Sequence, residues 1–323
     1  MPTDEKPFTP MHRRWMKRLG GSSMLMKFAG WLGRSRGKWR PFDQPSKLPQ
    51  PTATPDLTHW NKQELAAVWI GHATVLLRIG GLNILTDPVF SSRIGFGFGP
   101  ITAGPKRLIA PALTLDELPP IDLVLLSHAH FDHLDRPTLY RLGQQCKNAA
   151  VITSENNADL VTDLNFASVS ELKWGQLSNA KDIDITAVQV KHWGARTITD
   201  KHRGYCGFLI ESKNRRILFA GDTAYQEHFK FLSAQHGNRS PLDAIIIGIG
   251  AYDPWIWNHV NPEQAWELAH HAGAKAIIPV HHRTFRQSRE PLAEPMERLL
   301  AAAGSETDRV VIREIGQMWK DTL

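Results

Sequence analysis

Short apolar runs separated by turn residues open the main body of the chain. Three such runs, at residues 67–71, 74–79 and 82–86, are rich in the residue types that favour strands. Gly80 and Gly81 predict a tight turn between the second and third runs. The pattern therefore predicts three successive strands. Beyond them, a long stretch rich in glycine and proline predicts a loop, and loops of such length in compact domains are often functional. That loop covers residues 91–111.

The second half of the chain alternates strand-like runs with helix-like segments. Predicted strands cover residues 149–153, 183–190, 206–211, 216–220, 244–248 and 275–280. Predicted helices cover residues 137–145, 156–164, 262–272 and 291–303. Pro262 and Pro291 suit first helical turns, because proline lacks the N–H that a first turn leaves unpaired. This alternation predicts sheets with helices outside them.

The chain divides into three parts. Five prolines between Pro41 and Pro55 preclude a helix and predict an extended linker. We therefore expect an N-terminal arm at residues 1–43, a linker at residues 44–59 and a large domain at residues 60–323. With 323 residues and 42% hydrophobic content, the chain is long and apolar enough to bury a full core.

Charge separates the arm from the body. Residues 6–42 hold ten Lys and Arg and no Asp or Glu, so the rest of the chain, with 28 basic against 32 acidic residues, has a net charge of −4. Within the arm, apolar residues recur at helical spacing and predict an amphipathic helix. We expect peripheral contact with an anionic membrane through residues 11–40. The alternative is an arm that packs on its own domain or on a partner subunit.

Composition also indicates the cellular compartment and the classes of partner to expect. Cys146 and Cys206 are too few for a disulfide framework, so we expect a reducing, cytoplasmic compartment, with the arm on the inner membrane face. No apolar run approaches the ~20 residues that a membrane span needs. The apolar stripe of the arm favours a membrane over a nucleic acid, so no nucleic-acid partner is expected. A homodimer stays open.

The most informative segment is residues 127–135, which reads Ser-His-Ala-His-Phe-Asp-His-Leu-Asp directly after an apolar run. A histidine pair at i and i+2, His128 and His130, leaves a strand end toward one side. Asp132 and His133 can then turn toward a second point a few ångströms away. A single histidine is usually structural, but four ligand-type residues at this spacing predict two adjacent metal ions.

Two ions need about six or seven ligands, so further ligands should follow other strands. Three candidates do: His192, Asp222 and His281 each come after a predicted strand. Taken singly, each has a structural alternative, such as a turn residue or a core histidine. We assign one ion to His128, His130 and His192. The other ion is assigned to Asp132, His133 and His281, and Asp222 is expected to bridge the two.

Such a centre predicts hydrolytic chemistry. Metal coordination lowers the pKa of a bound water from about 15.7 toward ~7, which gives a hydroxide nucleophile at neutral pH. The same ions stabilise negative charge on a phosphoryl or acyl transition state. Nitrogen-rich coordination favours two Zn²⁺ ions, with Mn²⁺ or Fe²⁺ as alternatives. Asp132 and Asp222 are the expected catalytic residues.

Other stretches carry a family resemblance. They are residues 69–75, 85–93, 104–107, 117–122, 192–193, 221–223, 250–252 and 259–263. With the histidine motif, they make the chain similar to the metallo-β-lactamase superfamily, and within it to the N-acyl-phosphatidylethanolamine-hydrolysing phospholipase D family. The resemblance covers about residues 60–300. It implies an α/β (α+β) fold, a four-layer αβ/βα sandwich with a dizinc centre, and a phospholipid substrate.

The resemblance also implies residues on the substrate side. Tyr252 and His259 lie where the family contributes groups that face the substrate, although either could instead form a hydrogen bond that stabilises its loop. Related sequences often read His-Trp-Gly-Thr-Phe where this chain has His-His-Arg-Thr-Phe at residues 281–285. Arg283 could meet a substrate phosphate or reshape the pocket. His282 competes with His281 as a ligand, and His281 is preferred because it aligns with the motif.

The leading hypothesis is a phosphodiesterase of phospholipase D type, which by resemblance releases N-acylethanolamine and phosphatidic acid from an N-acylated aminophospholipid. A lactonase or another soluble hydrolase of the same superfamily is the first alternative. A scaffold with a degenerate centre is the second alternative, and the presence of all seven predicted ligands weighs against it. His72 is interpreted as structural, holding the first hairpin near the site.

Overall fold

The computed structural model describes residues 47–98, 101–197, 199–234 and 241–321. The predictions for the basic arm, including membrane contact through residues 11–40, therefore lie outside the described residues. No helix within the described part is long and apolar enough to cross a bilayer.

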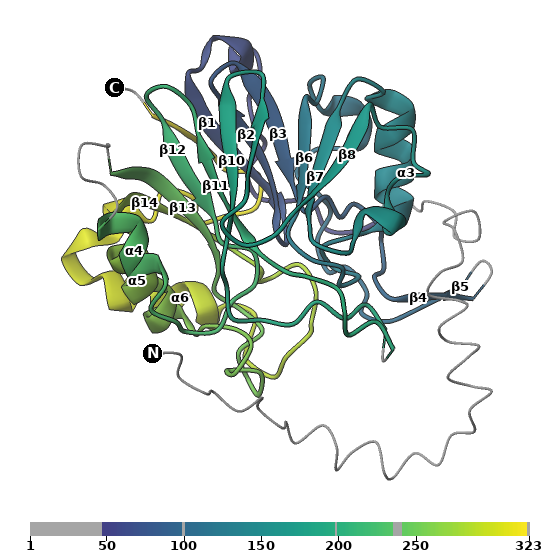
Figure 1. Cartoon of the computed structure of the whole chain (residues 1–323). Helices are drawn as coiled ribbons and strands as arrows, with labels where there is room; N and C mark the ends of the chain where they lie inside the picture. The colour runs from purple at the N-terminus through teal and green to yellow at the C-terminus, as the bar shows by residue number, and fades with distance from the viewer. Residues whose placement is uncertain (1–46, 99–100, 198, 235–240, 322–323) are drawn as a thin grey trace, which may run out of the picture.

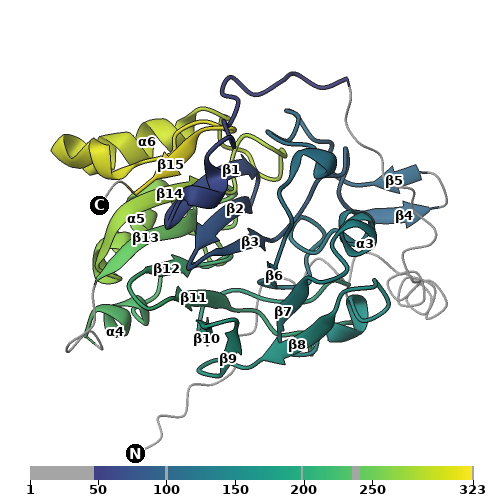
Figure 2. The same cartoon turned by 90° about the horizontal axis from the view of Figure 1, so that it is seen from above.

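Two β-sheets face each other, and helices cover their outer faces (Figures 1 and 2). The first sheet has the order β15-β1-β2-β3-β6-β7-β8. Its strands are β15 (Met318–Lys320), β1 (Leu65–Gly71), β2 (Thr74–Ile79), β3 (Leu82–Thr86), β6 (Leu123–Leu126), β7 (Ala150–Ser154) and β8 (Ser168–Leu172). The second sheet has the order β14-β13-β12-β11-β10-β9. Its strands are β14 (Ala274–Val280), β13 (Leu242–Gly248), β12 (Arg216–Phe219), β11 (Gly207–Glu211), β10 (Ile183–Val188) and β9 (Leu177–Ala180).

Helices form the two outer layers. They are α3 (Arg136–Gln145), α4 (Phe229–Ala234), α5 (Pro262–His271) and α6 (Glu294–Ala303). Leu139 and Leu142 of α3 pack with Val124 and Val151 of the first sheet. The helices α5 and α6 pack on the second sheet in the same way. The four layers confirm the predicted αβ/βα sandwich.

The strand β13 shows how the sequence specifies this arrangement. Ala244 and Ile246 belong to the core between the sheets, whereas Ile245 and Ile247 belong to the core beneath α5 and α6. Successive side chains of a strand point to opposite faces, so a strand that is buried on both faces needs an unbroken apolar run. That run was the feature that predicted the strand.

The predicted helix at residues 156–164 is wrong, because only the 3₁₀ turn Ala158–Leu160 forms there. The Glu171 carboxylate accepts hydrogen bonds from the N–H groups of Asn157 and Ala158, at 2.7 and 2.5 Å. The Asn157 amide in turn donates to Ser154. These bonds to side chains give the backbone an alternative to the helix.

Other boundaries also differ from expectation. The last helix begins at Glu294, so Pro291 precedes it, whereas Pro262 occupies the first turn of α5 as expected. The predicted loop at residues 91–111 contains a small hairpin, β4 (Phe96–Phe98) and β5 (Ile101–Ala103). The strands β8, β9 and β15 and the helix α4 were not predicted. Polar residues are frequent in β8 and β9, which lie at sheet edges.

Parallel pairing positions the functional loops. The strands β3, β6 and β7 run parallel in one sheet, and β12, β13 and β14 run parallel in the other. Parallel neighbours direct their carboxyl ends to the same edge of a sheet. The loops that follow β3, β6, β12 and β14 therefore meet at one edge of the sandwich.

Candidate metal centre

The loops at this edge bring all seven predicted ligands together. The segment after β6 carries His128, His130, Asp132 and His133, and the remaining three residues follow β10, β12 and β14. The ligand atoms form overlapping groups, and within each group they lie within 4.8 Å of one another. One group contains His128, His130 and His192. Another contains His72, Asp132, His133 and His281.

The first group is a triangle of imidazole nitrogens. The His130 Nδ1 atom lies 2.8 Å from His128 Nε2 and 3.3 Å from His192 Nε2. The Oδ2 atom of Asp222 lies 3.7 Å from His192 Nε2 and 4.0 Å from His128 Nε2. Bonds of about 2.0–2.1 Å to a tetrahedral zinc ion give ligand separations of about 3.3 Å. The triangle therefore matches the size of such a site.

The second group is built around the two carboxylates. The Oδ2 atom of Asp132 lies 3.3 Å from His281 Nε2 and 3.4 Å from His133 Nε2. The Oδ2 atom of Asp222 lies 3.1 Å from His133 Nε2 and 3.3 Å from His281 Nε2. A single carboxylate thus contacts both groups, which is the arrangement that a bridging ligand requires.

A chain of hydrogen bonds orients two of the rings. The Nδ1–H group of His133 donates a hydrogen bond to the Asp87 carboxylate, at 2.6 Å. The Ser127 hydroxyl donates to the same carboxylate and can then accept from the Nδ1–H of His128, at 2.9 Å. With both protons on Nδ1, the Nε2 lone pairs of these rings face the cluster. Such outer carboxylate and hydroxyl partners commonly set the tautomer of a metal-binding histidine.

The other rings are oriented in the same sense. The Nδ1–H of His192 donates to the backbone carbonyl of Asn258, at 3.0 Å, which leaves its Nε2 unprotonated. The Nε2 atoms of His133 and His281 are buried and have no hydrogen-bond partner among the described residues. Unpartnered buried nitrogen atoms are costly, and lone pairs that converge repel one another unless a cation lies between them. These residues therefore fit metal ions.

Burial and neighbouring charges shift the titration of the cluster. Burial, together with the neighbouring histidines, lowers the pKa of His130 to about 3 and that of His128 well below its usual value. Burial also acts on His281, but the carboxylates of Asp222 and Asp132 outweigh it and raise the pKa of His281 to about 9. Despite burial, the neighbouring imidazoles hold the pKa values of Asp132 and Asp222 well below the usual range. Both carboxylates are thus ionised at neutral pH.

Backbone contacts hold the histidine motif in place. The buried guanidinium of Arg196 donates to the carbonyls of Ala129 and Leu134, at 2.8 and 2.9 Å, so it clamps both ends of the motif. Gly221 has a φ of 59°, and a Cβ atom there would approach Ser127 Cβ to 2.9 Å. The absence of a side chain at this position lets the Asp222 loop lie against the strand end that carries His128.

Three residues at the centre were not predicted as part of it. His72 was interpreted as structural, yet its Nε2 atom donates to Asp132 Oδ2 at 2.9 Å. The amide of Gln287 donates to the same oxygen at 2.7 Å. Asp87 orients His133. The sequence could have indicated Asp87, because it directly follows a predicted strand, as several of the predicted ligands do. Gln287 lies in an irregular loop, where no sequence pattern indicates its role.

The predicted substrate-side residues differ in position. The Nδ1 atom of His259 lies 3.7 Å from Asp222 Oδ2, so this ring borders the cluster. The Tyr252 hydroxyl instead donates to Glu294 on α6, at 2.7 Å, which ties its loop to that helix. The Arg283 guanidinium donates to both oxygens of Glu314 at 2.8 Å. Their contact with a substrate stays a prediction.

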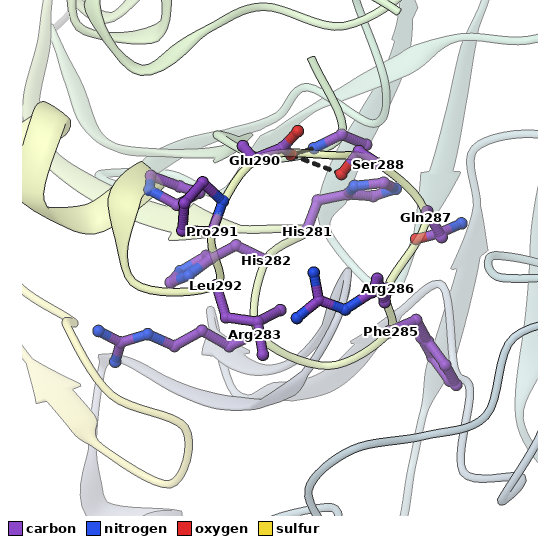
Figure 3. A pocket seen from close by; sticks show the side chains of 13 residues that line it. His281, His282, Arg283, Phe285, Arg286, Gln287, Ser288, Glu290, Pro291 and Leu292 are labelled. Carbon is purple, nitrogen blue, oxygen red and sulfur yellow. Dashed lines mark hydrogen bonds between the residues drawn. The ribbon is translucent and has the colours of Figure 1, made fainter. Parts of the chain in front are cut away.

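A small pocket lies beside the centre and is lined in part by His281, His282 and Gln287. Figure 3 shows His281 and Arg283 extending from opposite sides of the loop that follows β14. The His282 ring stacks on Trp69, with 4.6 Å between ring centroids, and belongs to neither ligand group. The structure thus brings His281, rather than His282, to the other ligands.

The chain is similar to known proteins. A family model described as a beta-lactamase superfamily domain matches residues 82–282. An uncharacterized protein of Mycobacterium tuberculosis is 34% identical over 275 residues, which cover 83% of this chain and 72% of that protein. The N-acyl-phosphatidylethanolamine-hydrolyzing phospholipase D 1 of Caenorhabditis elegans is 32% identical over 300 residues, with coverage of 85% and 81%. A mitochondrial enzyme of the same description from Saccharomyces cerevisiae is 31% identical, with coverage of 77% and 54%.

Two solved structures share the fold. Igni18, a metallo hydrolase from Ignicoccus hospitalis, has a TM-score of 0.60 and 18% identity, and the match covers 80% of this chain and 99% of that one. An isothiocyanate hydrolase from Delia radicum gut bacteria has a TM-score of 0.60 and 19% identity, with coverage of 79% and 98%. At this level of identity the similarity supports the architecture alone.

Metal stoichiometry tests the two ligand groups. We expect the metal-free chain to bind two zinc ions, and the variants His192→Ala and His281→Ala to bind one ion tightly, because each loses a ligand of one group only. His282→Phe is the matched control, since it changes the neighbouring buried imidazole and should still bind two ions. Calorimetric titration and elemental analysis would measure this. Loss of an ion in His282→Phe but not in His281→Ala would reverse the assignment.

Proton release provides an independent check of the second group. At pH 7 the His281 ring of the metal-free protein is protonated, because its pKa is raised to about 9. A metal ion must displace that proton and one from His133, whose pKa is raised well above its usual value because, despite burial, the neighbouring carboxylates favour its charged form. Zinc affinity should therefore rise with pH from pH 6 to at least about pH 9. Titrations in buffers of different ionisation enthalpy should show proton release at pH 7. A heat that does not depend on the buffer would contradict this expectation.

Proposed function

The chain belongs to the metallo-β-lactamase superfamily and has N-acyl-phosphatidylethanolamine-hydrolysing phospholipase D relatives; from this premise we propose that it is a dinuclear zinc phosphodiesterase of phospholipase D type. It is a metal-dependent hydrolase of that superfamily. The finer proposal concerns the metal, the number of ions and the bond that is cleaved. The proposed substrate is a phospholipid similar to N-acyl-phosphatidylethanolamine.

One observation carries the proposal: imidazole and carboxylate groups from four loops converge at one sheet edge in two groups that share Asp222. Bound metal ions supply an activated water at neutral pH and stabilise negative charge that develops on a phosphoryl oxygen. A carboxylate between two ions is typical of centres that hydrolyse phosphate esters. The donor set, five histidines and two aspartates, suits zinc.

The chain's own residues prepare the site for a phosphodiester. Asp132 and Asp222 are ionised at neutral pH, so they can accept hydrogen bonds from the attacking water and orient it. His72 and Gln287 hold Asp132 through hydrogen bonds of 2.9 and 2.7 Å, which restricts the rotation of its carboxylate. His259 borders Asp222 and remains neutral, because burial lowers its pKa well below the usual value. A neutral imidazole there can hydrogen-bond the oxygen that departs from phosphorus.

The proposed reaction joins the water oxygen to phosphorus and breaks the bond between phosphorus and the oxygen of the N-acylethanolamine. The departing oxygen takes up a proton, and the products are an N-acylethanolamine and phosphatidic acid. Arg283 is the proposed phosphate contact, for which its side chain would have to leave Glu314. The two phospholipase D relatives support the choice of this bond. Contact with the membrane through residues 11–40 is part of the same proposal.

Product analysis tests the proposed reaction directly. We expect the zinc-loaded full-length chain to convert N-acyl-phosphatidylethanolamine to the two products, with oxygen from ¹⁸O-labelled water in phosphatidic acid. The variant Asp222→Asn should lose at least about 10²-fold in kcat, because it weakens the ligand shared by both groups. Mass spectrometry of lipid extracts measures both the products and the label.

The exposed residue Asp116 offers a matched control, since Asp116→Asn makes the same chemical change on the surface, away from the centre. It should retain the parent rate. A zinc-loaded chain that leaves phosphodiesters intact but opens lactones would favour the lactonase alternative. Label in the N-acylethanolamine would instead show cleavage of a different bond.

A further inference from the structure

The exposed aromatic side chains are unevenly distributed over the described surface. Eight large apolar side chains are exposed: Phe96, Tyr140, Trp174, Leu177, Trp193, Phe231, Trp255 and Trp257. Four of them belong to segments that contact the metal centre, namely Phe96, Trp193, Trp255 and Trp257, and we call this set the aromatic rim. Their exposed fractions are 38%, 47%, 51% and 68%. Single exposed apolar residues are ordinary, but several exposed aromatic rings near one site mark an interaction surface.

Contacts place the first two members at the centre. The Trp193 ring lies against the His130 ring, with 4.6 Å between centroids. The Phe96 ring lies 4.8 Å from that of Phe131, which stands between His130 and Asp132 in the histidine motif. The Trp193 ring therefore contacts a predicted ligand directly, and the Phe96 ring contacts the residue between two of them. Phe96 begins β4, whereas Trp193 lies in the segment after β10.

The other two members come from the loop before α5. The indole N–H of Trp255 donates to the backbone carbonyl of Gln287, at 3.4 Å, and the Gln287 amide holds Asp132. Trp257 directly precedes Asn258, whose carbonyl orients His192. This loop thus contacts His192 directly and is linked to Asp132 through Gln287, and both of its indoles are exposed.

Basic residues accompany the aromatic rim. Lys191 precedes His192, and Arg286 and Arg289 flank the Gln287 loop; all three are exposed and form no ion pair within the described part of the chain. Figure 3 shows Arg286 on the loop that also carries Gln287. The exposed carboxylate of Asp253 lies in the loop of Trp255. Three basic residues against one acidic residue make these exposed positions basic, so this surface suits an anionic partner.

The basic arm of the chain itself is a poor occupant for this surface. Residues 6–42 contain ten Lys and Arg and no acidic residue, so the basic residues beside the aromatic rim would repel them. A bilayer with anionic lipids complements both surfaces. Tryptophan is also the side chain that most suits the boundary between headgroups and acyl chains, because its ring is apolar and its N–H is polar.

We propose that the aromatic rim docks the edge of the sandwich that carries the metal centre onto an anionic phospholipid bilayer. Indoles of Trp255 and Trp257 enter the boundary between headgroups and acyl chains, while Lys191, Arg286 and Arg289 contact lipid phosphates. This inference rests on the proposed function, since a lipid substrate could then reach the centre without leaving the membrane. It concerns a surface distinct from residues 11–40.

Vesicle binding by the full-length chain tests the proposal. The variants are Trp257→Ser and the double variant Trp255→Ser/Trp257→Ser, and Phe231→Ser on α4 is the matched control, because Phe231 is 61% exposed but belongs to an outer helix. On vesicles of phosphatidylethanolamine and phosphatidylglycerol, the double variant should bind at least about tenfold more weakly than the parent, as expected from lost apolar burial. The control should stay within about twofold of the parent.

A second measurement reports how deeply the indoles enter the bilayer. Lipids with brominated acyl chains should quench the tryptophan emission of the vesicle-bound parent. They should quench a smaller fraction of the emission of Trp257→Ser. Equal binding and equal quenching of parent and double variant would overturn the proposal, as would an equal loss in Phe231→Ser. A parent that binds no vesicle would also overturn it and point to a protein partner.

The test of membrane docking can be separated from the test of the proposed hydrolysis. Vesicles without any hydrolysable N-acylated lipid measure docking alone, and a soluble short-chain phosphodiester measures hydrolysis alone. Trp257→Ser should hydrolyse the soluble substrate at the parent rate. Hydrolysis without rim-dependent binding would refute docking only, and rim-dependent binding without hydrolysis would refute the phosphodiesterase only.

Discussion

The structure depends on one electrostatic constraint, the convergence of buried imidazole lone pairs and two ionised carboxylates at a single edge of the sandwich. Such groups lose their hydration on burial, and facing lone pairs repel one another. The Asp222 carboxylate approaches His133 and His281 to 3.1 and 3.3 Å, so it offsets part of this cost. Metal ions held by the two groups would satisfy the remaining nitrogens. The fold can be understood as the frame that makes this convergence stable.

The frame acts mainly through atoms that do not belong to the ligand set. Asp87 and Ser127 keep the protons of His133 and His128 on the outer ring nitrogens. Arg196 clamps the ends of the histidine motif. Ser127 adjoins His128 within the motif, but it is bound to Asp87, which lies 40 positions away, so the tautomers depend on the tertiary fold as well as on the motif. This explains how His130 and His133, which are only three positions apart, could serve two different ions.

The apolar runs predicted most of the buried strands, and the family resemblance implied the sandwich. The candidate ligands follow strand ends, and the structure brings them together at one edge. The sequence-based prediction failed where side chains compete with the helix for backbone hydrogen bonds, and where a residue's role depends on tertiary contact. Residues 156–164 have a helical pattern, yet Glu171 captures the N–H groups that would begin the helix. Gln287 reaches Asp132 across 155 positions, which no spacing rule can detect. The proximity of the aromatic rim to the ligands likewise appears only when segments distant in sequence are brought together.

Anomalous diffraction at the zinc absorption edge, on crystals of the zinc-loaded chain, tests the central claim most directly. The account predicts two peaks about 3.5–4 Å apart. One should lie within about 2.2 Å of nitrogens of His128, His130 and His192, and the other near His133 and His281, with Asp222 between them. A single peak, or two peaks that do not share Asp222, would contradict it.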